Sequence, residues 1–141
     1  MILSSEVVEA NRLISGALGV PLASQVYKMR ILYVIDGEPE LLQVSYIPYA
    51  RIQEISDWKS EDQFSYKRFE EQYDRDIVKR TEEIMLVKAT GEEERELCLK
   101  KDSEVLMVKG TSYDRFERIV EYYEMVSATD FYVFCSTMIE E

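Results

Sequence analysis

Hydrophobic residues recur along this chain at two spacings, which predict where helices and strands lie. Between Glu6 and Leu18 they follow the spacing of one helix face, and Gly19 followed by Pro21 predicts the end of that helix. Residues 26–35 and 41–47 alternate in the manner of strands, with Asp36-Gly37 between them as a hairpin signal. Residues 1–5 are expected to form a short strand.

The second half of the chain predicts further helices and then more strands. Ser60-x-x-Gln63 and Thr90-x-x-Glu93 are capping boxes, each typical of a helix start. We expect helices over 49–58, 60–73 and 90–99, a β-rich segment within 77–89, and strands over 105–113, 119–127 and 131–137. No repeat, linker or domain boundary interrupts the pattern. The fold class is therefore α+β, a single domain over 1–141 whose mainly antiparallel sheet has helices packed on one side.

Charge and residue usage exclude several functions. The chain has 141 residues with 28 acidic and 17 basic side chains, a net charge of −11, and no histidine. So acidic a domain repels phosphate backbones, and we do not expect it to bind nucleic acid by itself. Without histidine, neither a Ser-His-Asp nor a Cys-His site can form within the chain. We expect no metal and no cofactor.

The two cysteines have neither a metal-ligand nor a redox spacing. Cys98 and Cys135 lie in mixed apolar contexts, and we expect both to be small core residues in a reduced, cytoplasmic protein. No apolar stretch is long enough to span a membrane, and the first residues lack the basic start of a signal peptide.

Glu121 is the candidate functional residue that stands out most. Alternation along its strand would put Ile119, Glu121, Tyr123, Met125 and Ser127 on one face, and Val120, Tyr122, Glu124 and Val126 on the other. A half-buried carboxylate needs hydrogen-bond donors, from the protein or from a ligand's hydroxyl or ammonium groups. The alternative is that Glu121 or Glu124 simply faces water on an open sheet.

Five segments, taken in order, resemble the UTRA domain. This domain is the effector-binding module of GntR-superfamily bacterial transcription regulators of the HutC branch. The segments are Asn11 to Val20, Val26 to Arg30 with the turn Asp36 to Pro39, Ser45 to Pro48, Tyr66 with Phe69, Glu70 and Tyr73, and Val120 to Tyr122 followed by Asp130, Tyr132 and Phe134.

The resemblance implies a fold like that of chorismate lyase, used without catalysis. Such domains bind a small metabolite on the sheet, form homodimers, and shift the position of winged-helix DNA-binding domains. No winged helix is recognisable in these 141 residues, so we expect contact with DNA only through a domain absent from this chain.

The resemblance also locates a binding site. Members that bind phosphorylated sugars have an Arg-x-Arg pair whose positions fall here at Ile31 and Tyr33, an acidic residue that falls at Gln43, and a Tyr-Arg pair that falls at Ser127 and Ala128. Phosphate prefers arginine forks, so their absence favours a non-phosphorylated, neutral or cationic effector. We expect Glu121, Tyr33, Gln43, Tyr123, Ser127, Ile31, Ser65 and Tyr66 to line the site.

Two features of this site stay open at the level of sequence. A two-residue turn at Asp36-Gly37 would put Tyr33 and Gln43 on opposite faces, whereas a three-residue turn with a bulge would put them together. The helix that starts near Ser65 and Tyr66 could instead present backbone amides to an anionic effector.

Two other functions compete with a sensor of a transcription repressor. The first is a dimerisation module whose site is filled by Ile31, Tyr33 and Met125. The second is a chorismate lyase-like enzyme, which the missing Arg-x-Arg pair and the absence of histidine argue against.

Overall fold

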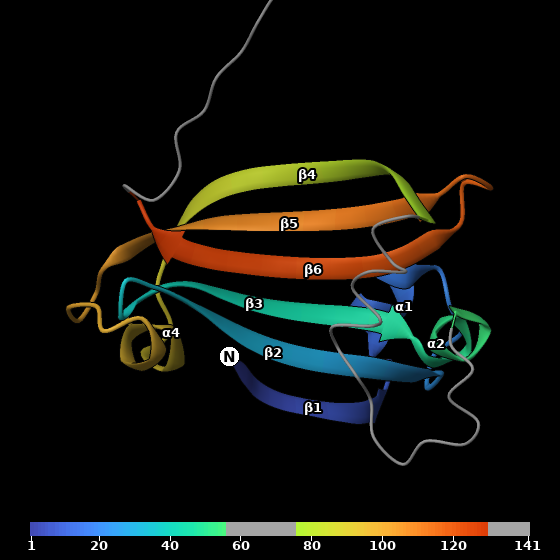
Figure 1. Cartoon of the computed structure of the whole chain (residues 1–141), viewed down its shortest axis with the longest axis horizontal. Coiled ribbons are helices and arrows are strands. Elements are labelled where there is room, and N and C mark those ends of the chain that lie inside the picture. Colours follow the sequence, from blue (N-terminus) through green and yellow to red (C-terminus); the bar gives the residue numbers. More distant parts are fainter. Residues whose placement is uncertain (56–75, 130–141) are drawn as a thin grey trace, which may run out of the picture.

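The described part of the chain folds around one antiparallel sheet. The computed structural model describes residues 1–55 and 76–129. Its elements are β1 (Ile2–Glu9), α1 (Arg12–Leu18), β2 (Gln25–Ile35), β3 (Glu38–Pro48), α2 (Tyr49–Ile55), β4 (Ile77–Lys88), α4 (Gly91–Glu96), β5 (Glu104–Asp114) and β6 (Ile119–Ala128). The six strands have the order β1-β2-β3-β6-β5-β4 (Figure 1). The predicted helix over 60–73 and strand over 131–137 lie outside the described residues.

The sheet has two faces, which we name by what lies on them. The helix face carries Val26, Leu32, Leu42, Tyr122 and Val126, which pack in two clusters with side chains of α1 and with Leu97, the residue that follows α4. The site face carries Met29, Ile31, Gln43, Tyr123 and Ser127. Cross-strand partners lie on the same face, and so do residues two apart along one strand. As predicted, α1 and α4 lie on one side of the sheet. Helix α2 differs, because its Ile52 belongs to a cluster on the site face.

The start of the chain corrects the sequence analysis. The expected helix from Glu6 begins only at Arg12, because β1 continues to Glu9 and pairs Val7 with Tyr27 and Val8 with Val26. Two consecutive β-branched residues favour a strand, and a partner strand was available. The Asn11 side chain then caps α1 by accepting the Ile14 N–H at 2.9 Å. Gly19 ends the helix in the left-handed conformation, as predicted.

A bulge corrects the predicted faces at the start of β6. Ser112 pairs with Glu121 and Tyr113 with Ile119, so Val120 is the extra residue. Ile119 consequently packs with the α1 cluster on the helix face, whereas Val120 joins the cluster on the site face. From Glu121 onward, the predicted alternation holds.

Cys98 is not the core residue that its context predicted. It is exposed and has a φ of 54°, because α4 ends at Glu96 and Leu97 is the residue that turns into the core. Cys135 lies outside the described residues.

Candidate functional site

The hairpin of β2 and β3 determines which predicted site residues meet. Asp36 and Gly37 both have positive φ and form a two-residue turn, which alone would have separated Tyr33 from Gln43. A register shift after Tyr33 pairs Val34 with Pro39 but Tyr33 with Leu41, which restores the common face. Ile31 therefore faces Gln43 directly, with Tyr33 on the same side. The turn is therefore the two-residue alternative, and a separate bulge in the hairpin gives the common face that the sequence analysis expected only from a three-residue turn.

Strand β6 adds three more predicted residues to this face. Gln43 is opposite Met125, Ser45 is opposite Tyr123, and Leu41 is opposite Ser127. The structure thus brings Ile31, Tyr33, Gln43, Glu121, Tyr123 and Ser127 to one face of the sheet. Ser65 and Tyr66 lie outside the described residues. Binding of a ligand by these side chains stays a prediction.

Glu121 is buried, with only 7% of its surface exposed. The alternative in which it faces water is therefore wrong. Its cross-strand partner on β5 is Ser112, whose hydroxyl lies 3.4 Å from Nε of Arg80 on β4. A buried carboxylate thus lies on the same row of the sheet as an arginine and a buried serine, in surroundings where its hydrogen bonds are strong.

Tyr123 crosses the sheet to β4. Its hydroxyl donates a hydrogen bond of 2.6 Å to Oε2 of Glu82. Burial raises the pKa of Tyr123, and so does the Glu82 carboxylate that accepts its hydrogen bond. The charge of Glu121 adds to this increase, and the charge of Arg80 opposes it. Tyr123 is therefore a neutral hydrogen-bond donor at physiological pH, in a cluster with two carboxylates and one guanidinium.

Gly110 makes this path of Tyr123 possible. Gly110 lies on β5, where its cross-strand partners are Tyr123 on β6 and Glu82 on β4. A Cβ atom at Gly110 would lie 2.1 Å from Cζ of Tyr123, a distance that real atoms do not adopt. The ring therefore occupies the space that any other residue would fill. A glycine inside a strongly predicted strand was the sequence signal for this close approach, and the sequence analysis missed it along with Glu82 and Arg80.

Small hydroxyl side chains make up the rest of the polar surface. Ser45 and Ser127 are buried on the site face, and Gln43 donates from Nε2 to Oγ of Ser45 at 2.7 Å. Ser127 donates to the carbonyl oxygen of Ala128 at 3.1 Å. Ser45 and Ser112 were not predicted to line the site. Ser45 lies two residues from the predicted Gln43, and Ser112 is the cross-strand partner of the predicted Glu121. Buried serines on a sheet face supply donors and acceptors while filling little volume.

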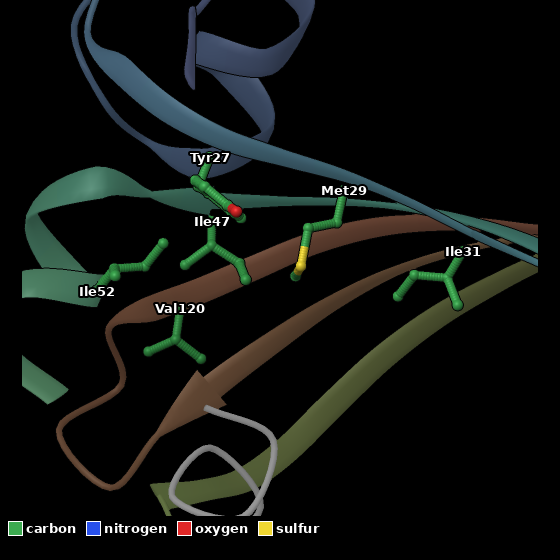
Figure 2. Close-up of a cluster of buried hydrophobic side chains, with 6 residues drawn as sticks. All are labelled: Tyr27, Met29, Ile31, Ile47, Ile52 and Val120. Atoms are coloured by element: carbon green, nitrogen blue, oxygen red, sulfur yellow. The ribbon is translucent and has the colours of Figure 1, made fainter. Parts of the chain in front are cut away.

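An apolar cluster borders the polar residues. The cluster consists of Tyr27, Met29, Ile31, Ile47, Ile52 and Val120 (Figure 2). Tyr33 packs against it. Ile31 is thus shown to be a packing residue, whatever it contacts in a ligand. An apolar wall beside a few placed polar groups is the usual composition of a small-molecule site.

A buried carboxylate fixes α2 to the end of this cluster. Oδ2 of Asp114 lies 3.0 Å from Arg51 of α2 and 2.8 Å from Arg118. Its Oδ1 accepts the N–H groups of Phe116 and Arg118. Burial alone would raise the pKa of Asp114, but the hydrogen bonds from Arg118 and Phe116 outweigh it and lower the pKa. The ionised Asp114 therefore holds the β5–β6 turn and α2 together.

Residues 1–55 and 76–129 were searched for a metal site and for a membrane-spanning helix. These ranges contain no group of three or more Asp, Glu or Cys residues placed to hold a metal ion. They also contain no helix that is long and apolar enough to cross a membrane. The site face instead offers hydrogen bonds and one apolar wall, an arrangement suited to binding a small molecule.

The chain belongs to the UTRA domain family, whose model matches residues 1–132. It is a ligand-sensing regulatory domain of the kind that GntR-family transcription regulators contain. No curated protein matches the chain in sequence.

Solved structures agree with this fold. A GntR-family transcriptional regulator from Enterococcus faecalis V583 has a TM-score of 0.81 at 17% identity, covering 98% of this chain and 99% of that chain. The effector domain of PhnF from Mycobacterium smegmatis has a TM-score of 0.80 at 16% identity, covering 99% and 86%. A GntR-family regulator from Bacillus cereus has a TM-score of 0.80 at 18% identity, covering 99% and 96%. Identities this low show the shared fold alone.

Proposed function

We propose that this chain is the effector-sensing and dimerisation domain of a cytoplasmic repressor of the HutC branch of GntR regulators. It binds a small non-phosphorylated molecule on the site face and catalyses no reaction. A winged-helix domain outside these 141 residues contacts DNA. The observation that carries the proposal is the buried Glu121 beside the Tyr123–Glu82 pair, because a buried carboxylate is costly unless hydrogen-bond donors satisfy it.

The charge of the site face supports the choice of ligand. Among the residues that the structure describes, the charged groups that act on Tyr123 are the carboxylates of Glu82 and Glu121 and the guanidinium of Arg80, so this described cluster carries more negative than positive charge. A phosphate dianion would meet two carboxylates with one guanidinium to offset them, which is unfavourable. Hydroxyl or ammonium groups of a neutral or cationic effector donate to these carboxylates instead. Tyr33 provides an aromatic surface on the same face of the sheet, in the row of Leu41 and Ser127.

Regulation by such a domain is a shift of population. An effector that binds one arrangement of the dimer more tightly than another favours that arrangement by the difference in binding free energy. The attached DNA-binding domains then change their spacing. In a repressor, the favoured arrangement is the one that fits the operator less well.

A thermal-shift screen tests this function. The purified chain is heated with sugars, sugar phosphates, amino acids and polyamines, and then again as Glu121→Gln. An effector at about 100 times its Kd adds about 2.7 kcal/mol of stability. For a domain of this size the melting temperature then rises by roughly 5–15 °C. We expect a stabilising sugar, amino acid or polyamine whose effect is lost in Glu121→Gln and kept in Glu6→Gln, a control on exposed β1.

Other results would contradict the proposal in distinct ways. Stabilisation by phosphorylated compounds only would overturn the choice of effector and leave the sensor intact. A response that survives Glu121→Gln would place the site elsewhere.

A dimerisation module without an effector is the second candidate. The packing of Ile31 and Tyr33 with the apolar cluster favours it, because side chains that fill a site leave no space for a ligand. A lack of response across the whole screen, together with a dimer in solution, supports this alternative. Turnover of chorismate by the purified chain would support the enzyme instead.

A further inference from the structure

Two charged side chains of β4 reach inward over the site face. Nε of Arg80 lies 3.4 Å from the hydroxyl of Ser112 on β5, and the Glu82 carboxylate accepts the hydroxyl of Tyr123 on β6 at 2.6 Å. Strand β4 is the last in the described strand order, so charged side chains there could have turned outward to water. They extend instead over β5, toward the residues of β6.

Small residues on β5 leave room for this arrangement. The cross-strand partner of Arg80 on β5 is Ser112, and that of Glu82 is Gly110. A serine side chain is short and a glycine has none, so neither separates β4 from β6 on this face. Both charged groups of β4 can therefore act together with those of β6.

The charges that meet here have a definite ratio. Among the described residues, Glu82, Glu121 and Arg80 are the charged groups that act on Tyr123, which gives two carboxylates and one guanidinium. A ligand that complements all three groups carries two cationic groups and one carboxylate. A sugar complements none of these charges, and a polyamine leaves the guanidinium without a counter-charge. The ratio is that of an amino acid with a basic side chain.

The arrangement of the three groups also fits such a molecule. Arg80 and Glu121 belong to one row of the sheet, because Ser112 is the cross-strand partner of both. Glu82 belongs to the next row of the same face, about 7 Å further along β4. The two charges on the α-carbon of an amino acid are adjacent, whereas the side-chain cation lies some distance away. The shared row therefore suits the α-carbon, and Glu82 suits the end of the side chain.

We propose that Arg80 and Glu82 of β4 select the effector, and that the effector is an amino acid with a basic side chain. This inference rests on the proposed function and names the chemical class of its ligand. Arg80 binds the carboxylate through its guanidinium fork, and Glu121 accepts hydrogen bonds from the α-ammonium group. Glu82 binds the side-chain cation, while the Tyr123 hydroxyl holds the Glu82 carboxylate in position.

A ligand series that removes one charge at a time tests the class. Isothermal titration calorimetry of the 141-residue chain compares ornithine with putrescine, δ-aminovalerate and norvaline. These analogues lack, in turn, the carboxylate, the α-ammonium group and the side-chain ammonium group. We expect each to bind roughly 10- to 100-fold more weakly than ornithine, because each loses one hydrogen-bonded charge pair. Lysine with its corresponding analogues repeats the test for a side chain one methylene longer.

A variant of Arg80 tests the carboxylate contact. We expect Arg80→Gln to weaken ornithine binding roughly tenfold or more without weakening putrescine binding, because putrescine has no carboxylate. Lys79→Gln is the matched control. It removes the same charge from the next residue of β4, whose Nζ lies 4.8 Å from the centroid of the Tyr113 ring and which faces the other side of the sheet. A preference for ornithine over putrescine that survives Arg80→Gln would overturn the role of Arg80.

A variant of Glu82 tests the side-chain contact in the same way. Glu82→Gln should weaken ornithine binding and leave norvaline binding unchanged, because norvaline lacks the side-chain ammonium group. Glu83→Gln, on the opposite face of the same strand, should leave the binding of both ligands as in the wild type. Equal effects of Glu82→Gln and Glu83→Gln would contradict the assignment.

The outcomes separate this inference from the proposed function. A sugar or another uncharged compound that stabilises the chain through Glu121, with no binding of ornithine or lysine, would overturn the amino acid and leave the sensor standing. Putrescine binding as tightly as ornithine would also overturn the amino acid and keep a sensor of polyamines. A chain that binds none of these compounds would contradict both.

Discussion

Tyr122 and Tyr123 are neighbours in the sequence and lie on opposite faces of the sheet. Tyr122 packs with α1 on the helix face, and its hydroxyl donates to Glu124 of the same strand at 2.7 Å. Tyr123 crosses Gly110 on the site face and donates to Glu82, two strands away. Burial raises the pKa of both tyrosines, and so does the accepting carboxylate. A tyrosine–glutamate hydrogen bond thus lies within one strand on the helix face, and on the site face it joins residues of two different strands.

The difference shows where this fold keeps its polar groups. On the helix face, apolar side chains of α1 and Leu97, the residue that follows α4, pack against the sheet. Arg30 of β2 forms an ion pair with Glu92 of α4. On the site face, Ser45, Ser112, Ser127 and Glu121 are buried among the strands. Polar groups are costly to bury, so their concentration on one face supports the proposal that this face binds the effector.

The largest effect is expected from breaking the helix face. Leu18→Ala removes a fully packed side chain of α1 and should lower the free energy of unfolding by about 3 kcal/mol. Urea denaturation measures this loss. Because Leu18 lies on the opposite face from Glu121, the folded variant should keep the thermal-shift response to the effector. Loss of that response at temperatures where the variant is folded would show that the two faces are coupled.

Gly110→Ala tests the site face in a similar way. The new methyl group collides with the Tyr123 ring, and we expect a loss of about 2 kcal/mol together with loss of the effector response. The matched control is Gly16→Ala in α1, where a Cβ meets no atom within 4 Å. There alanine should stabilise the helix by about 0.5–1 kcal/mol. Equal results for the two glycines in urea denaturation would contradict the close approach of Tyr123.

Asp114→Asn tests the contact that holds α2 to the site face. The lowered pKa of Asp114 means that its ionised form stabilises the fold above the unfolded pKa of about 4 and that this stability is lost as pH falls through the lowered folded pKa. We therefore expect the variant to be less stable than wild type at pH 7, with the gap narrowing in acid. Urea denaturation at pH 7 and at pH 3 measures it. A difference in free energy of unfolding between variant and wild type that is the same at pH 7 and pH 3 would show that the charge of Asp114 contributes little.

The two tyrosines give the smallest effects and the sharpest contrast. Tyr122→Phe and Tyr123→Phe each remove one hydrogen bond to a carboxylate, at a cost of about 1 kcal/mol. Only Tyr123→Phe should weaken the effector response. Because the folded pKa of each tyrosine is raised, its contribution is present below about pH 10 and is lost as pH rises beyond that value. Thermal unfolding between pH 8 and 11 follows this loss.

The sequence by itself determined the local elements and the class of protein. Alternation over β2, β3, β5 and β6 and the capping box at Thr90 predicted structure correctly, because these patterns depend on neighbouring residues. Ordered segments that resemble the UTRA domain identified the family. The helix expected over Glu6 to Leu18 exists, but its predicted start was wrong because a strand partner decided between helix and strand over residues 6–9.

Only the tertiary structure decided which side chains share the site. The bulge beside Tyr33 restored its common face with Gln43, and the bulge at Val120 exchanged the faces of two residues. Glu82 and Arg80 joined the site because β4 lies next to β5, a neighbour far away in the sequence. Local patterns follow from the period of one strand, whereas a one-residue shift between strands moves every side chain to the other face. That shift is determined by the sheet as a whole.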